Sequence, residues 1–406
     1  MSKVKGNAVI GQSGGPTAVI NQSLVGVILE ARKHGHIGKL LGARHGVSGI
    51  VKEDFIELNN VPEELCERIA NTPAAALRST RDKPDQAYCE RIFKTFAKND
   101  VRYFFYIGGN DSADTARIVS ELAKQANYDL QVFHIPKTID NDLRVHDHCP
   151  GYPSAAKFVA CAMIGDNFDN RSLPGIKIDV VMGRNAGYLT AAAVLARQHE
   201  EDGPHLIYVP EVPISEEKLL GDVDRIFSKK KRCLIAVSEG IEVSPGKTWF
   251  EYLASTHERD AHGNLQLSGS GELGDHLINL VRRKLTPAGG KPPRARADTF
   301  GYIQRSFPGV RSEVDCLEAR LVAQMAVRYS AEPGKSGSVA MRRQPGANYG
   351  VELFLTPLET VARVAKKMEA EFIDNGNNIT QQFIDYARPL VGKMPVVGSF
   401  DEMKTI

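Results

Sequence analysis

A short apolar segment, a glycine-containing loop and a helical pattern follow one another several times along this chain of 406 residues. The clearest copies run from NAVI into GQSGGPTA, from VRYFFYI into GGNDS, and from KIDVVM into GRNAGY and an alanine-rich helix that ends near Arg197. In the first copy, Ile20, Leu24 and Ile28 share one helical face. Continuous apolar strands that alternate with helices indicate parallel sheets covered on both faces. We therefore expect an α/β protein.

Composition argues against several classes of protein. Charged residues make up 25% and hydrophobic residues 42% of the chain, and the net charge is +2. These values are typical of a globular protein and argue against a nucleic-acid or membrane partner. No segment approaches the ~18 consecutive apolar residues of a membrane span, and the N-terminus does not resemble a secretory signal. Six cysteines without CxxC spacing indicate reduced thiols and a cytoplasmic protein.

Two glycine-containing loops are candidate phosphate sites. In parallel sheets, ligands bind beyond the carboxyl ends of the strands, where these loops lie. In GQSGGP (11–16), the glycines allow close backbone approach, and exposed N–H groups before a helix favour phosphate. The alternative is a plain strand-to-helix turn. GGNDS (108–112) follows the same logic, although Asp111 or Ser112 could simply cap the helix.

The stretch PKTIDNDL (136–143) carries the most specific pattern. It follows the apolar run QVFHI and gathers one lysine, one threonine and two aspartates within a few positions. A loop this polar at the end of a buried strand is costly unless it binds something. Lys137 could meet a phosphate group, while Asp140 and Asp142 could serve as general base and metal ligand. The alternative is a structural cluster of Asx turns.

Arginines near the ends of the expected strands suit phosphate groups, although a single surface arginine is usually only solvated. They are Arg78, Arg81, Arg184, Arg296 and Arg305. The HDHC run (146–149) lacks a second ligand pair at metal spacing, so we expect a loop or packing role for it.

Two further segments give structural expectations. The Pro- and Arg-rich run PAGGKPPRARAD (287–298) indicates a loop. Residues 312–330 predict a helix whose core face carries Val314, Leu317, Leu321 and Met325.

These motifs occur together and in one order, and as a set they resemble the phosphofructokinases. The resemblance runs from about Val4 to about Ser330 and is carried by SGGP, GGNDS, PKTIDND, MGRNAG, VSEG and GYIQR. It implies two Rossmann-like α/β/α domains with the active site in the cleft between them, in a homo-oligomer (dimer or tetramer). The implied domains are 1–150 plus about 304–350 for the phosphoryl donor, and 151–303 plus about 351–406 for the sugar phosphate.

The resemblance also implies roles for residues that match the family motifs. Asp140 corresponds to the general base for the sugar 1-hydroxyl, with Thr138 and Asp142 beside it. The implied sugar-phosphate pocket, in which Arg296 reaches the 6-phosphate, consists of Met182, Gly183, Arg184, Glu239, Arg296, Tyr302 and Arg305. The implied donor site consists of Gly14, Gly15, Arg81, Gly109, Asp111 and Lys137.

Asp111 and Lys137 bear on which donor is used. ATP-using members of the family carry glycine at both positions, whereas this chain resembles the pyrophosphate-using members. An Asp111 carboxylate ~4 Å from the α-phosphate of ATP would repel it by about 4 kcal/mol at an effective dielectric constant near 20, roughly a thousandfold in affinity. Lys137 supplies positive charge to the transferring phosphoryl group and the leaving phosphate. The expected reaction is Mg²⁺-dependent, reversible transfer from pyrophosphate to fructose 6-phosphate, a step of glycolysis and gluconeogenesis.

Some positions depart from the family pattern. Asn110 stands where many relatives have a metal-binding aspartate, so the expected Mg²⁺ ligands are Asn110 or Asp111, together with Asp142. Tyr302 replaces a histidine that is common in the ATP-using enzymes. Gly175 stands where those enzymes present an arginine across a subunit interface, and Lys177 could compensate.

Two alternatives stay open. One is an ATP-dependent phosphofructokinase that tolerates Asp111 and Lys137. The other is a catalytically inert regulatory subunit that keeps the fold and binds sugar phosphate. An inert subunit needs no general base, so the intact TIDND motif at 138–142 weighs against the second alternative.

Overall fold

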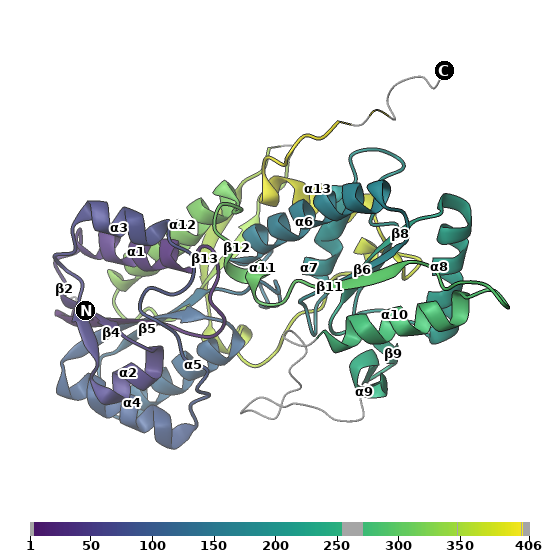
Figure 1. Ribbon diagram of the computed structural model, residues 1–406. Helices are drawn as coiled ribbons and strands as arrows, with labels where there is room; N and C mark the ends of the chain where they lie inside the picture. Colours follow the sequence, from purple (N-terminus) through teal and green to yellow (C-terminus); the bar gives the residue numbers. More distant parts are fainter. Residues whose placement is uncertain (1–3, 254–270, 347, 399, 401–406) are drawn as a thin grey trace. The chain divides into compact units, whose positions relative to one another are not determined.

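The computed structural model describes residues 4–253, 271–346, 348–398 and 400. The chain divides into two units, one made of Met1–Ala155 with Arg305–Lys366 and the other of Ala156–Gln304 with Lys367–Ile406. Each unit has its own sheet (Figure 1). Each unit also has its own hydrophobic core. No helix within the described residues is long and apolar enough to cross a membrane.

The first unit is built on a seven-stranded sheet of order β13-β12-β5-β4-β1-β2-β3. Its strands are β1 (Gly6–Gln12), β2 (Ile37–Ala43), β3 (Phe55–Glu57), β4 (Val101–Gly108), β5 (Gln131–Pro136), β12 (Gly337–Arg343) and β13 (Val351–Thr356). The inner pairs from β12 to β2 are parallel, while β13 and β3 add antiparallel edges. Strands such as β4 are buried almost throughout, which explains their continuous apolar sequences.

Helices cover both faces of this sheet (Figure 1). One face packs against α1 (Ile20–Ala31), α3 (Glu63–Ala70) and α12 (Glu313–Ser330). The other face packs against α2 (Gly46–Lys52), α4 (Gln86–Lys98) and α5 (Asn110–Gln125). The loops after β1, β4 and β5 therefore leave the sheet at the same edge, because these three strands run parallel.

The second unit is built on a four-stranded, fully parallel sheet of order β11-β6-β8-β7. Its strands are β6 (Ile176–Val181), β7 (Leu206–Tyr208), β8 (Cys233–Ser238) and β11 (Ala295–Thr299). Its core includes residues of α8 (Glu216–Lys230), α9 (Trp249–Leu253) and α10 (Glu272–Leu285). Its other helices are α7 (Tyr188–Ala191), α13 (Gln381–Val391) and the 3₁₀ helix η1 (Ala192–Ala196). Two helices cross the boundary between the units along the chain, namely α6 (Tyr152–Ser172) and α11 (Ile303–Ser306).

Smaller elements complete the chain. They are the hairpin strands β9 (Glu242–Ser244), β10 (Lys247–Thr248), β14 (Ile373–Asp374) and β15 (Asn378–Ile379), and the 3₁₀ helices η2 (Leu358–Thr360) and η3 (Ala370–Phe372). The α/β class with mostly parallel sheets agrees with the expectation from the sequence. All six cysteines are free thiols.

The helix predicted at 312–330 is present and Met325 packs against the core, but the prediction for the core face is wrong for Leu317. Leu317 is 59% exposed, and the buried face of α12 instead carries small residues such as Ala319, Ala323 and Ala326. The cause is close packing against α1, because a Cβ on Gly26 would lie 2.6 Å from the carbonyl oxygen of Arg320. Large apolar side chains do not fit at so short an interhelical distance.

Three boundary predictions also differ from the structure. Part of the expected loop at 287–298 is strand β11, which pairs in parallel with β6 despite its charged residues. The expected helix ending near Arg197 is only α7 followed by η1. Residues 351–366 cluster with the first unit, although we expected them in the second domain, because β13 pairs with β12.

Candidate functional site

The turn after β1 brings glycine backbone close to three cationic side chains. Gly14 has φ 75°, a conformation that favours glycine. A Cβ on Gly14 would lie 3.0 Å from Lys137 Nζ, and a Cβ on Gly15 would lie 2.9 Å from Arg305 Nη1 and 3.4 Å from Arg81 Nη2. Glycine at position 14 suits this conformation, and a side chain at position 14 or 15 would have to displace the end of a cationic side chain. The turn and the three cations together form a small region suited to phosphate.

Lys137 is the buried member of this cationic group. It follows β5 directly, its backbone N–H donates to the Gly108 carbonyl oxygen at 2.9 Å, and the residue is 4% exposed. Burial, together with the positive charges of Arg81 and Arg305, lowers the pKa of Lys137 to about 7, against a smaller opposite effect of two aspartates. A buried ammonium group beside two guanidinium groups is electrostatically unfavourable until an anion arrives. This arrangement supports a binding role over a purely structural turn.

The TIDND loop holds Asp142 through two neutral donors. Thr138 Oγ1 donates to Asp142 Oδ1 at 3.1 Å, and Asn110 Nδ2 donates to Asp142 Oδ2 at 3.3 Å. Burial is the main reason that the pKa of Asp142 is raised, although the hydrogen bond from Thr138 acts in the opposite direction. The backbone N–H of Asp140 donates to Thr138 Oγ1 at 3.1 Å, and the Asp140 side chain is half-buried in the same loop.

The first turn of α5 places Asn110 and Asp111 differently. Gly109 is the N-cap and no side chain caps the helix, so the alternative that Asp111 or Ser112 acts as a cap is wrong. Asn110 Oδ1 is buried and accepts no hydrogen bond from the described residues. The Asp111 side chain is 63% exposed, and its Oδ2 lies 3.2 Å from Lys83 Nζ.

Lys83 is a residue that reasoning from the sequence missed. It lies two positions after Arg81, on the loop whose Thr80 carbonyl oxygen accepts a hydrogen bond from Gly14 N at 3.0 Å. Its position in the sequence, only two residues after the predicted donor-site residue Arg81, was the signal that could have identified Lys83. Its ion pair with Asp111 reduces the negative charge that Asp111 presents to a ligand.

In the second unit, two parallel strands place predicted residues at the same edge of the sheet. Val181 ends β6 and precedes Met182, Gly183 and Arg184, while Ser238 ends β8 and precedes Glu239. The two loops are joined, because Ser238 Oγ donates to the Gly183 carbonyl oxygen at 2.6 Å. Glu239 is 4% exposed, and its N–H donates to the Val181 carbonyl oxygen at 2.8 Å.

Tyr302 follows the neighbouring strand β11 at this edge and is 48% exposed, but Arg296 lies near the opposite end of β11. Arg296 pairs in register with Lys177, three residues before the Thr299–Val180 pair, which corresponds to about 10 Å along the strand. The structure therefore does not bring Arg296 together with Arg184 and Glu239 within the unit. Arg305, which the resemblance placed in the same pocket, belongs to the first unit and lies beside Gly15.

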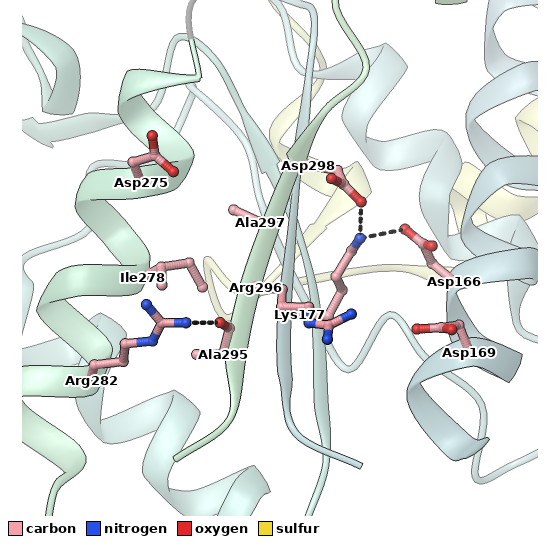
Figure 2. A pocket seen from close by; sticks show the side chains of 10 residues that line it. All are labelled: Asp166, Asp169, Lys177, Asp275, Ile278, Arg282, Ala295, Arg296, Ala297 and Asp298. Carbon is pink, nitrogen blue, oxygen red and sulfur yellow. Dashed lines mark hydrogen bonds and ion pairs between the residues drawn. The ribbon is translucent and has the colours of Figure 1, made fainter. Parts of the chain in front are cut away.

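Arg296 and Lys177 line a cavity of about 520 Å³ at that end of the sheet (Figure 2). Lys177 Nζ pairs with Asp298 and also lies 3.4 Å from Asp166 and 3.5 Å from Asp179. Three carboxylates already share this ammonium charge, which argues against the suggestion that Lys177 replaces the arginine missing at Gly175.

Comparisons with known proteins agree over most of the chain. A family model described as Phosphofructokinase matches residues 7–330. The pyrophosphate–fructose 6-phosphate 1-phosphotransferase of Rhodospirillum rubrum is 51% identical over 390 residues, which cover 96% of this chain and 95% of that protein. A protein of the same name from Halomonas elongata is 36% identical over 396 residues, covering 95% and 91%. The crystal structure of a pyrophosphate-dependent phosphofructokinase from Nitrosospira multiformis aligns with a TM-score of 0.82 at 33% identity, covering 98% of this chain and 94% of that chain.

Proposed function

The chain belongs to the phosphofructokinase family, and we propose that it transfers a phosphoryl group from pyrophosphate to the 1-hydroxyl of fructose 6-phosphate. The products are fructose 1,6-bisphosphate and phosphate. The observation that carries the choice of donor is the buried Lys137 ammonium beside the Gly14 turn, flanked by Arg81 and Arg305. Because pyrophosphate and a sugar bisphosphate have comparable transfer potentials, the reaction runs readily in both directions.

In the proposed chemical step, the site residues of the first unit have different roles. Asp140 accepts the proton of the sugar 1-hydroxyl while the hydroxyl oxygen forms a bond to the nearer phosphorus of pyrophosphate. The bond from that phosphorus to the bridging oxygen breaks, and inorganic phosphate leaves with the electron pair. Lys137, Arg81 and the backbone of the Gly14 turn bind the donor and neutralise the charge that develops on it.

The residues around the start of α5 fit a magnesium ion. Asn110 Oδ1 is a buried oxygen without a donor among the described residues, and the Asp142 carboxylate lies beside the same side chain. Oxygen ligands of this kind suit Mg²⁺, so we propose that Asn110 and Asp142 hold it. The ion supplies charge neutralisation to the phosphoryl oxygens when it is bound. Asp111 is the less suitable ligand, because it is exposed and paired with Lys83.

We propose that the sugar phosphate is bound by the loops after β6 and β8 together with residues that match the family motifs. Arg184 supplies a guanidinium fork for an anionic oxygen, and the buried Glu239 accepts hydrogen bonds from sugar hydroxyls. Met182, Gly183 and Tyr302 complete this edge of the sheet. Arg305 remains a proposed phosphate ligand, whereas for Arg296, near the other end of β11, that role rests on the family resemblance alone.

The donor is tested by a coupled assay with fructose 6-phosphate and Mg²⁺, in which pyrophosphate and ATP are offered separately. We expect kcat/KM for pyrophosphate to exceed kcat/KM for ATP by at least about a hundredfold, or about 2.7 kcal/mol. Equal values for the two donors would overturn the proposal and favour the ATP-dependent alternative. No turnover with either donor would favour the inert subunit.

The depressed pKa of Lys137 predicts a pH dependence for donor binding. Below a pH of about 7 the ammonium is charged and attracts pyrophosphate; above it the free enzyme loses that charge. We expect kcat/KM for pyrophosphate to fall above pH ~7. The value of kcat should fall only at a higher pH, because the bound anion favours the charged form of Lys137. The matched control is Lys137→Arg, whose guanidinium does not titrate in this range. A limb that persists unchanged in this variant belongs to another group.

A further inference from the structure

Residues 361–366, here called the strap, lie outside the segment that the family model matches but contact the proposed catalytic loop. The strap follows η2 in the first unit, whereas the family match ends at residue 330. Val361 and Ala362 are buried in one apolar cluster with Ala113 of α5 and with Leu143 and Cys149. The last two belong to the loop 138–149, which begins with the TIDND motif. The strap thus packs against the two segments that carry Asn110, Asp140 and Asp142.

Lys366 joins the strap to the loop through three hydrogen bonds. Its backbone N–H donates to the Asp142 carbonyl oxygen at 2.8 Å, next to an antiparallel bridge between Ala365 and Leu143. Its Nζ donates to the carbonyl oxygens of His146 and Asp147, each at 2.9 Å. One residue therefore holds the loop both at Asp142 and four to five positions later.

The segment that Lys366 holds contains strained backbone. Asn141 has φ 58° and Val145 has φ 74°. Asparagine tolerates this left-handed region, but a β-branched valine is an outlier there. Such conformations persist only where the surrounding structure enforces them. The carbonyl groups that accept from Lys366 Nζ belong to the two residues directly after Val145.

The strap and the loop each contact a helix of the first unit as well. Arg363 Nε donates to Asp114 Oδ2 at 2.9 Å, which ties the strap to α5 one turn after Asn110. At the far end of the loop, the fully buried His148 lies between Asp147 Oδ2 at 2.7 Å and Glu318 Oε2 at 2.6 Å. Burial lowers the pKa of His148, but these two carboxylates outweigh it and raise the pKa to about 9, so a charged imidazole bridges Asp147 and Glu318.

We propose that Lys366 is a positioning residue for phosphoryl transfer, which holds the strained turn at 141–147 so that Asp140 and Asp142 keep their reactive placement. A general base displaced by even about 1 Å loses much of its effect, because proton transfer needs hydrogen-bond geometry. Lys366 does not itself touch the reacting groups in this scheme. The inference rests on the proposed function of the TIDND loop.

The test compares three replacements of Lys366 in the full-length chain. Lys366→Met removes the ammonium but keeps an unbranched stem, and we expect kcat to fall at least about 30-fold while KM for both substrates changes less than about threefold. Lys366→Arg keeps the donors and should recover kcat to within about fivefold of the parent. Lys366→Gln covers the case that Lys366→Met does not fold. Lys335→Met, on an exposed lysine of the same unit, is the matched control and should leave kcat unchanged.

A second variant distinguishes positioning from general loss of stability. Val145→Gly relieves the strain, so the effect of Lys366→Met on kcat should be at least about threefold smaller in that background. Hydrogen exchange provides a readout independent of substrate, and amides of residues 143–147 should exchange faster in Lys366→Met than in Lys335→Met. Unchanged exchange and unchanged kcat in Lys366→Met would overturn the proposal, as would equal losses in Lys366→Arg and Lys366→Met.

Measurements on the wild-type chain distinguish a failure of this inference from a failure of the proposed function. Absence of turnover with pyrophosphate in the wild type contradicts the proposed donor, and the Lys366 series is then measured with the donor that does support turnover. Normal wild-type turnover combined with a parent-like Lys366→Met variant contradicts the inference alone.

Discussion

Asp140→Asn is expected to lower kcat by ~10²–10⁴-fold, while KM for fructose 6-phosphate changes only a few-fold. Asparagine keeps the shape of the side chain and its capacity for hydrogen bonds, but it cannot accept the proton of the 1-hydroxyl. The loop itself should survive the change, because Asp140 contributes its backbone N–H to Thr138 Oγ1 and that group is retained. Steady-state kinetics with pyrophosphate and fructose 6-phosphate measure both constants.

The reverse reaction provides an internal check on this role. The carboxyl that takes the proton in one direction must return it in the other, so Asp140→Asn should slow both directions together. Asp129→Asn, an isosteric change at an exposed aspartate of the same unit, is the matched control and should leave kcat unaffected. A large rise in KM with kcat intact would instead make Asp140 a binding residue and contradict the mechanism.

The elements that the sequence predicted best are those whose local pattern and tertiary environment agree. β1, β4 and β5 are continuously apolar because both faces of the sheet are covered, and the polar loops after them lie at one edge because the strands are parallel. That rule places the loops of Gly14 and Lys137 at one edge of the sheet, although 123 positions separate the two residues. Only the family resemblance placed both residues in one donor site.

The features that the sequence did not predict depend on contacts between distant segments. Periodicity placed Leu317 in the core, but the close approach of α1 selects small residues on the other face of α12. The charged residues Arg296 and Asp298 favoured a loop in the sequence, but on β11 they line a polar cavity with Lys177 (Figure 2). Lys366 has no motif around it, and only the chain's return to the TIDND loop reveals its contacts. Arg296 matched a family motif, yet its strand position separates it from Glu239.

Lys137→Gly is expected to lower kcat with pyrophosphate by at least ~10²–10³-fold, because the ammonium acts on charge that develops in the transition state. Lys137→Met separates the two consequences of this change, since methionine removes the charge but fills most of the space. Both variants should lose pyrophosphate activity to a similar extent. Only Lys137→Gly creates room, and its gain with ATP should stay small while Asp111 remains.

Asp111 should contribute less to donor choice than its charge alone suggests. A dielectric constant near 20 suits a partly buried pair of charges, but the Asp111 side chain is 63% exposed and paired with Lys83. In surroundings close to water, the same repulsion at ~4 Å is only about 1 kcal/mol, roughly a fivefold effect on ATP affinity. Asp111→Gly should therefore bind ATP about fivefold more tightly in calorimetry and keep most of its pyrophosphate activity. Lys83→Met should have the opposite effect on ATP, because it leaves the Asp111 charge unbalanced.

The double variant Asp111→Gly/Lys137→Gly tests whether the two positions act together. Each single glycine variant keeps one obstacle to the nucleotide, either the Asp111 carboxylate or the buried Lys137 side chain. The gain in ATP use of the double variant should therefore exceed the product of the gains of the two single variants. Calorimetric titration with ATP separates binding from turnover in all four proteins of the cycle. If Asp111→Gly and the double variant bind ATP no better than the parent, the residues that exclude the nucleotide lie elsewhere, and Lys137 acts on pyrophosphate chemistry alone.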